Sequence, residues 1–300
     1  MSKHLFGMIL THQGIYANNR GDNEGNATTL QKVLGPDGDL YTTVSAEAIR
    51  YALREGWQAK GLSLNRTTPD HRSCVFKDRS FEKWQDHLDD DVMGYMHAKE
   101  ETRSRRGLLE ITRALSLTPW RGEIMQNFAS PGSNVGVTHK NPIPYAVEVH
   151  HTRYQFGFAL TPEFLGREGN SRNSTLDAAQ KRERLRWVLE GLLNLRRAGG
   201  NHARYLSDYS PEALVLRWTD DPAPRFLHCF RMDEQGRLSL QPLLDRVQSG
   251  DIESEELVIG TSLPFLELDN FQKKFEPGVK KAVEALLKMV RDEDLCPPVQ

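Results

Sequence analysis

The sequence is poor in residues that build covalent cross-links. Its three cysteines, Cys74, Cys229 and Cys296, are odd in number, far apart and form no CxxC pair. They indicate neither a disulfide framework nor a zinc site, and they fit a reducing cytoplasm. No apolar run approaches the roughly 18 residues of a membrane span. The apolar run at residues 7–10 is too short for the core of a signal peptide, so we expect a cytoplasmic protein that does not contact membranes.

Motifs of the common enzyme classes are also missing. The sequence contains no GxxxxGK[ST], no GxGxxG and no GxSxG, which argues against nucleotide hydrolysis, dinucleotide binding and a serine nucleophile. The pair His150-His151 is a weak metal candidate, because adjacent residues of a strand point to opposite faces. His87 lies beside the acidic run 89–91, which we expect to be solvated. We therefore expect no cofactor and no metal.

Charge of either sign is not in excess. The 300 residues are 38% hydrophobic and 27% charged, with a formal net charge of −2. Any nucleic-acid site must therefore be a local patch. Residues 181–204 hold seven Lys/Arg against two Asp/Glu, whereas residues 245–276 hold three against eight. One basic and one acidic flank suit a protein that stacks head-to-tail on copies of itself.

Among the features that are present, the stretch 45–54 predicts a helix. Ser45 is suited to cap it, and apolar residues continue at helical spacing through Ile49 to Trp57. Arg50 and Arg54 stand one above the other on a different face. The spacing alone fits either a solvated amphipathic helix or a helix that grips a phosphate backbone.

Two loops could accompany such a helix. A polar loop over residues 13–43 precedes it and carries the asparagine- and glycine-rich stretch 18–26. Near residue 200, a predicted helix over 176–197 is followed by the sequence GGNHAR of residues 199–204. Glycine lets a backbone approach a phosphate and Arg204 supplies charge, although a plain helix end and turn is equally consistent.

Strands and helices alternate irregularly, which predicts an α+β fold built on a split βαβ sheet with insertions. Residues 5–10 read as a central strand. Residues 58–105 are polar and poor in aromatic residues, so we expect an insertion that packs on the core without forming it. Residues 118–144 hold four prolines and three glycines and read as a long loop, which is usually either functional or disordered.

These stretches, taken in order, resemble the DevR autoregulator family. The strand at 5–10 with its asparagine loop, the stretch 44–54, the stretch 145–154 and the glycine loop at 199–204 carry the likeness. Members of that family are the repeated backbone subunits of type I CRISPR interference complexes, here of a type I-B-like kind, within the wider group of RAMP proteins.

The resemblance implies a hand-shaped subunit. It would comprise a modified RRM- or ferredoxin-like palm (1–56 and 145–300), a helical finger insertion (57–105) and a protruding thumb loop (118–144). Copies would polymerise along the guide RNA (crRNA), together with other subunits of the complex, and present it in blocks to the target DNA strand. Such a subunit does not cut RNA.

The resemblance also implies which residues bind RNA. These are Asn18, Asn19, Arg20, Asn23, Asn26, Ser45, Arg50, Arg54, Arg121, Lys140, Gly199, Gly200, Asn201, His202 and Arg204. Met125 or Phe128 would act as an apolar wedge in the thumb. Two alternatives stay open: an RNA-cleaving subunit that uses Asp22, as in related type III proteins, and a regulator that binds promoter DNA.

Overall fold

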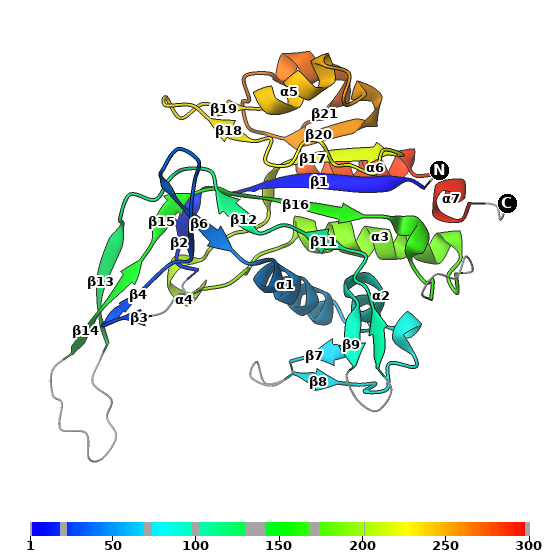
Figure 1. The fold of residues 1–300 in the computed structure, drawn as a ribbon, viewed down its shortest axis with the longest axis horizontal. Coiled ribbons are helices and arrows are strands. Elements are labelled where there is room, and N and C mark those ends of the chain that lie inside the picture. Colours follow the sequence, from blue (N-terminus) through cyan, green and yellow to red (C-terminus); the bar gives the residue numbers. More distant parts are fainter. Residues whose placement is uncertain are drawn as a thin grey trace.

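A computed structural model of the chain describes residues 2–18, 23–68, 74–97, 102–129, 142–168, 174–200 and 202–297. Its centre is a mixed sheet of nine strands within those ranges (Figure 1). Eight of them follow one another in the order β21 (Phe275–Glu276), β20 (Leu257–Thr261), β17 (Pro211–Thr219), β1 (His4–Thr11), β16 (Tyr154–Leu160), β12 (Ala114–Ser116), β6 (Leu40–Val44) and β5 (Lys32–Leu34). The ninth strand, β11 (Glu110–Ile111), also pairs with β16.

The predicted split βαβ arrangement is present around β1. This strand is antiparallel to both β16 and β17, so those two run parallel with β1 between them. Helix α3 (Ala178–Leu193) connects β16 to β17. Helix α1 (Ala46–Ala59) follows β6 and packs on the same face as α3, with Ile49, Leu53 and Trp57 buried as expected.

Both faces of the central sheet are covered. On β1, Leu5 and Ile9 point into the core beneath α1, α3 and α6 (Val279–Met289), whereas Phe6, Met8 and Leu10 point into a second core. The second core is closed by α5 (Gln241–Gln248), η4 (Leu268–Lys274) and the loop around Phe230. Because two cores share one strand, residues 5–10 read as a continuous apolar run.

The remaining short elements lie outside the central sheet and its main helices. They are β2 (Gly14–Tyr16), β15 (His150–Thr152), η2 (Pro162–Phe164), α4 (His202–Tyr205), β18 (Arg231–Met232), β19 (Leu238–Ser239), η3 (Ser254–Glu256) and α7 (Asp292–Leu295). On β15, His150 is buried and His151 is exposed, so the pair does point to opposite faces. No helix within the described ranges is long and apolar enough to cross a membrane.

Residues 118–144 are only partly a loop. Strand β13 (Ile124–Ala129) pairs antiparallel with β14 (Ile143–Glu148), and β14 pairs with β4 (Ala27–Thr28), which in turn pairs with β3 (Asn23–Glu24). We call these four strands the hairpin arm. It extends from the sheet on the same side as α1 (Figure 1).

The segment 57–105, here called the insertion, differs from the prediction. Beyond the end of α1, its described residues form two short hairpins, β7–β8 (Arg66–Thr67, Val75–Phe76) and β9–β10 (Tyr95–His97, Arg103–Arg105). A 3-10 turn, η1 (Trp84–Asp86), and the six-residue helix α2 (Leu88–Met93) lie between them. The prediction of a mostly helical insertion is therefore wrong. Leu64, Leu88 and Val92 also belong to the main core, so the insertion helps to form it.

Asp91 fastens the insertion to the rest of the fold. Its side chain is fully buried, not solvated as the sequence suggested. The carboxylate lies between the guanidinium groups of Arg105 in β10 and Arg184 in α3, and it accepts a hydrogen bond from the backbone N–H of Gly166 at 3.0 Å. One carboxylate thus joins the insertion, α3 and the loop after η2.

Asp89 and Asp90 are buried as well. Asp89 accepts hydrogen bonds from the backbone N–H groups of Asn65 and Arg66 at 2.8 and 2.9 Å, and Asp90 accepts one from the Asn65 side chain at 2.8 Å. Burial and the neighbouring Asp89 carboxylate raise the pKa of Asp90 to about 7, from an ordinary 3.8. Asp90 therefore favours its neutral form in the folded protein.

Replacing Asp91 by Asn should destabilise the fold by about 3–5 kcal/mol, because two buried guanidinium groups lose their counter-charge. Chemical denaturation would measure the effect. Asp86→Asn, an exposed change in the same segment, is the control and should cost less than about 0.5 kcal/mol. Equal effects of the two substitutions would show that Asp91 is not the anchor.

The raised pKa of Asp90 gives a pH dependence of defined sign. Well below pH 3.8 the group binds its proton in both folded and unfolded chains, whereas above pH 7 the folded chain carries a buried charge. Its contribution to stability therefore falls as the pH rises from about 4 to about 7. Asp90→Asn should raise the free energy of unfolding by roughly 1–3 kcal/mol at pH 8 and have little effect at pH 4.5. If Asp90→Asn changed the free energy of unfolding by the same amount at both pH values, this account would be contradicted.

Candidate nucleic-acid interface

A groove of about 1180 Å³ runs across α1. Its floor is the exposed face of α1, from the cap residue Ser45 to Gln58. One wall is the insertion, through β7, β8 and β9, and the other wall is the loop around Gly199 and Gly200. The side chains in it that carry charge or aromatic character are Glu47, Arg50, Tyr51, Arg54, Glu55, Arg66, Phe76, Tyr95, Arg105 and Arg197. Five arginines against two glutamates make the groove locally basic in a nearly neutral protein.

The N-terminal end of α1 opens into this groove. Ser45 caps the helix as predicted, with its hydroxyl accepting the N–H of Ala48 at 3.2 Å. The other first-turn N–H groups and the helix dipole favour negative charge at this end. Ser45, Glu47 and Ala48 all line the groove. The position of the cap thus directs helix donors toward any bound anion.

The glycine loop lies against this helix end, as the sequence suggested. Gly199 and Gly200 both have φ of +83°, a conformation that favours glycine. A Cβ on Gly200 would stand 2.2 Å from the carbonyl oxygen of Ala17, whereas a Cβ on Gly199 would meet only ordinary contacts with Ala48 and Val44. Gly200 is therefore required by packing against residues 17–18. The loop does not cap α3, which ends at Asn194.

Arg50 and Arg54 line the groove but serve mainly to hold the insertion. Arg50 donates to the carbonyl oxygens of Leu109 at 2.8 Å and Met93 at 2.5 Å. Arg54 lies 3.9 Å from the Asp89 carboxylate, and burial with the nearby Arg66 charge lowers the pKa of Arg54 to about 10. Both remain charged at neutral pH. The Arg50 guanidinium is thus used within the protein, whereas the contact of Arg54 with Asp89 is a long ion pair. Phosphate binding by the two residues stays a prediction.

Asn18 is also engaged within the fold. Its side chain is buried, and its amide donates to the carbonyl oxygen of Thr43 at 3.0 Å and to the hydroxyl of Tyr154 at 3.1 Å. These bonds connect the start of the polar loop to the sheet, and RNA contact by Asn18 stays a prediction. Asn26 is exposed at the hairpin arm, where its carbonyl oxygen accepts the N–H of Ala146.

The groove contains two arginines that the sequence did not single out. Arg197 is exposed beside the glycine loop, and Arg66 lies with its guanidinium 5.0 Å from the centre of the Phe76 ring. Within the described part of the chain, neither guanidinium has a carboxylate partner. Arg197 could have been predicted from its position next to the glycine loop, whereas no neighbouring residue in the sequence marks Arg66 as part of a binding site.

The hairpin arm carries the other predicted residues. Phe128 and Met125 are exposed, at 68% and 37%, on opposite faces of β13. Arg204 stacks 5.3 Å from the centre of the Tyr145 ring, at the base of the arm. Arg121 forms a two-point ion pair with Asp39 at 2.7 and 2.9 Å, so its charge is already partnered. The arm thus presents apolar side chains and one stacked cation.

Some predicted positions lie outside the described residues, namely Asn19, Arg20, Asp22, Lys140 and Asn201. Asn23 and His202 are described by their backbone alone. The groups of His, Cys, Asp and Glu within the described ranges include none that could hold a metal ion.

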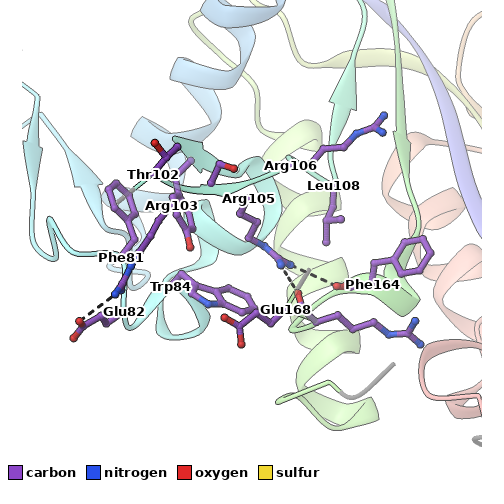
Figure 2. Close-up of a pocket in the computed structure, with 13 residues that line it drawn as sticks. Phe81, Glu82, Trp84, Thr102, Arg103, Arg105, Arg106, Leu108, Phe164 and Glu168 are labelled. Atoms are coloured by element: carbon purple, nitrogen blue, oxygen red, sulfur yellow. Dashed lines mark hydrogen bonds and ion pairs between the residues drawn. The ribbon is translucent and has the colours of Figure 1, made fainter. Parts of the chain in front are cut away.

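A second cleft, of about 900 Å³, lies between η1, β10 and the loop after η2 (Figure 2). It also contains arginines, but their charges are used within the protein. Arg105 pairs with Asp91 and stacks on Trp84, Arg103 lies 3.5 Å from Glu82, and Arg167 pairs with Glu163. The groove over α1 is therefore the stronger candidate for an anionic ligand.

Comparisons with known proteins agree with this geometry. Residues 14–234 match the model of a family described as CRISPR-associated negative auto-regulator DevR/Csa2. A protein of Myxococcus xanthus (strain DK1622), described as CRISPR-associated protein Cas7/Cst2/DevR, is 41% identical over 278 residues, which is 87% of each chain.

Solved structures share the fold at low sequence identity. A chain of a CRISPR RNA-guided surveillance complex matches with a TM-score of 0.56 and 13% identity, over 96% of this chain and 99% of that one. A chain of such a complex in a pre-nicking state matches with a TM-score of 0.63 and 11% identity, over 95% and 99%. From the family match and the close relative, we conclude that the chain belongs to the DevR/Csa2 family of CRISPR-associated proteins.

Proposed function

We propose that the protein is a guide-RNA-binding backbone subunit of a CRISPR interference complex and that it does not cut RNA. The observation that carries the proposal is the basic groove over α1, in which the Ser45 helix end, the glycine loop and the side chains of Arg66 and Arg197 converge. Family membership and the likeness to surveillance-complex chains support the same role.

The chemistry of the groove suits a nucleic acid that is bound through its own sugar-phosphate backbone. Helix N–H groups, glycine backbone and arginines bind phosphate without reading base edges. A subunit that must accept every guide sequence needs this kind of contact. On the part of the main sheet formed by β1, β17 and β20, α5 and η4 cover the face opposite α1. Base stacking on that face, as in an ordinary RNA-recognition motif, is therefore not part of the proposal.

The hand-shaped division of the chain fits this arrangement. In our proposal the sheet with its helices is the palm, the insertion is the finger region and the hairpin arm is the thumb. The exposed Phe128 and Met125 would wedge between nucleotides of the guide and so divide the target DNA strand into short blocks. Arg204, at the base of the arm, would hold a neighbouring phosphate.

Copies of the chain would stack head-to-tail along the guide. The basic segment 181–204 lies with α3 beneath the sheet, and the acidic segment 245–276 lies with α5 and η4 across its other face (Figure 1). Exposed arginines of the first segment include Arg186 and Arg196, and exposed acids of the second include Asp245 and Asp269. Opposite charges on opposite faces suit a repeating, non-closing contact.

Replacing Arg66 and Arg197 together by Gln should weaken binding of single-stranded RNA. It should also flatten the slope of log K against log salt by about 0.7 for each lost phosphate contact, or about 1.4 in total. Titrations of labelled RNA at several salt concentrations would measure both. These two residues are better targets than Arg50 and Arg54, whose loss would also release the insertion.

A matched control replaces Arg106 and Arg237 by Gln. The two side chains are exposed, at 87% and 61%, and lie outside the groove. The control should leave the salt slope unchanged. A slope that falls equally in both double variants, or in neither, would mean that the groove does not hold the RNA.

The number of protein subunits bound to one RNA should increase with the length of that RNA. Sedimentation with RNAs of increasing length should show complexes that grow by whole subunits of 34.2 kDa, whereas the protein without RNA should remain small. A single subunit per RNA at every length would contradict the head-to-tail arrangement. Duplex DNA of the same length is a useful comparison, because a promoter-binding regulator would prefer it.

A further inference from the structure

The wall of the groove formed by the insertion differs in chemistry from the wall formed by the glycine loop. Beside the arginines, the insertion and the adjoining turn of α1 present a set of apolar and aromatic side chains to the groove. These are Tyr51, Phe76 and Met96, here called the shelf. They come from three separate elements, α1, β8 and β9.

The shelf is open to solvent. The side chain of Met96 is 75% exposed and Tyr51 is 41% exposed, although both residues are apolar enough to favour burial. Single exposed apolar residues are common on proteins and need no explanation. Two such residues, together with the half-buried Phe76, share one groove with five arginines, a combination that single exposure does not explain.

Arginine side chains also lie beside the aromatic side chains of the shelf. The Arg66 guanidinium lies 5.0 Å from the centre of the Phe76 ring. The Tyr51 hydroxyl donates to Glu55 at 2.8 Å, which fixes the ring at the edge of α1, between the turns that carry Arg50 and Arg54. Sites for single-stranded nucleic acid combine a positive groove for the backbone with flat or polarisable side chains on which bases stack.

The two walls of the groove therefore suit different parts of a nucleic-acid strand. The side formed by Ser45, Gly199 and Gly200 offers backbone donors and helix N–H groups, which suit phosphate. The shelf side offers π-faces and a thioether, which suit bases. We propose that bases of the bound strand stack on Tyr51, Phe76 and Met96, with the sugar-phosphate backbone turned toward the glycine loop. This inference rests on the proposed RNA-binding function and adds a non-specific base contact to it.

The test compares two RNAs that differ only in their bases. One is an ordinary single strand, and the other is an oligonucleotide of the same length with abasic riboses throughout. The wild-type protein should bind the ordinary strand more tightly, by on the order of tenfold, because stacking adds to the phosphate contacts. Tyr51→Ala combined with Met96→Ala leaves Phe76 in place and should remove most of this preference, weakening the ordinary strand several-fold and leaving the abasic strand and the salt slope unchanged.

Two controls separate stacking from damage to the fold. Tyr51→Phe keeps the ring and should retain the preference. Leu34→Ala removes an equally exposed apolar side chain on β5, outside the groove, and should change nothing. A melting temperature within the range of the controls would show that the double variant is folded.

Two results would overturn the inference. Either the double variant keeps the full preference for base-bearing RNA, or it loses affinity for both strands alike. Failure of the proposed function itself would look different, because the wild-type protein would then bind neither strand in a salt-dependent way.

Discussion

The buried carboxylate of Asp91 is the contact on which the rest of the structure depends. It brings Arg105 of the insertion and Arg184 of α3 together at one point, and it also fixes the loop at Gly166. Breaking such a pair leaves an uncompensated charge in the interior, so the insertion has one stable position. That position sets the second wall of the groove over α1. An interaction made by a carboxylate outside the groove thus supports one wall of the proposed binding surface.

The covering of the sheet also bears on why we propose the groove, and not the sheet, as the RNA-binding surface. Helix α5, η4 and the residues around Phe230 close the face of the sheet opposite α1. This covering converts β1 into a strand that is buried on both sides, which stabilises the centre of the molecule. In our proposal, RNA contacts the helix end at Ser45, the glycine loop and side chains of the insertion and the arm.

Local features of the sequence predicted the local parts of this account. Ser45 and the spacing from Ile49 to Trp57 gave the start and the buried face of α1, because capping and amphipathic periodicity depend on neighbours within a few residues. The opposite faces of His150 and His151 followed from strand geometry in the same way. The fold class, α+β with a split sheet, could also be inferred from the order of elements.

What could not be predicted depends on partners that are distant in sequence. Asp89–Asp91 read as solvated because their partners lie elsewhere, Arg184 being 93 positions away from Asp91. Arg50 and Arg54 read as free for the same reason, since the carbonyl groups and the carboxylate that occupy them belong to the insertion and its flank. Arg66 carries no local signal at all, and only the folded chain brings it into the same groove as Arg197.

The central claim, that the groove over α1 holds the backbone of a guide RNA, is tested most directly by an electron cryo-microscopy structure of the protein assembled on single-stranded RNA. The account predicts density for consecutive phosphates along the groove, within hydrogen-bonding distance of the N-terminal turn of α1 and of Arg66 and Arg197. Continuous RNA density that follows the second cleft or the outer face of the sheet, with the groove empty, would contradict it.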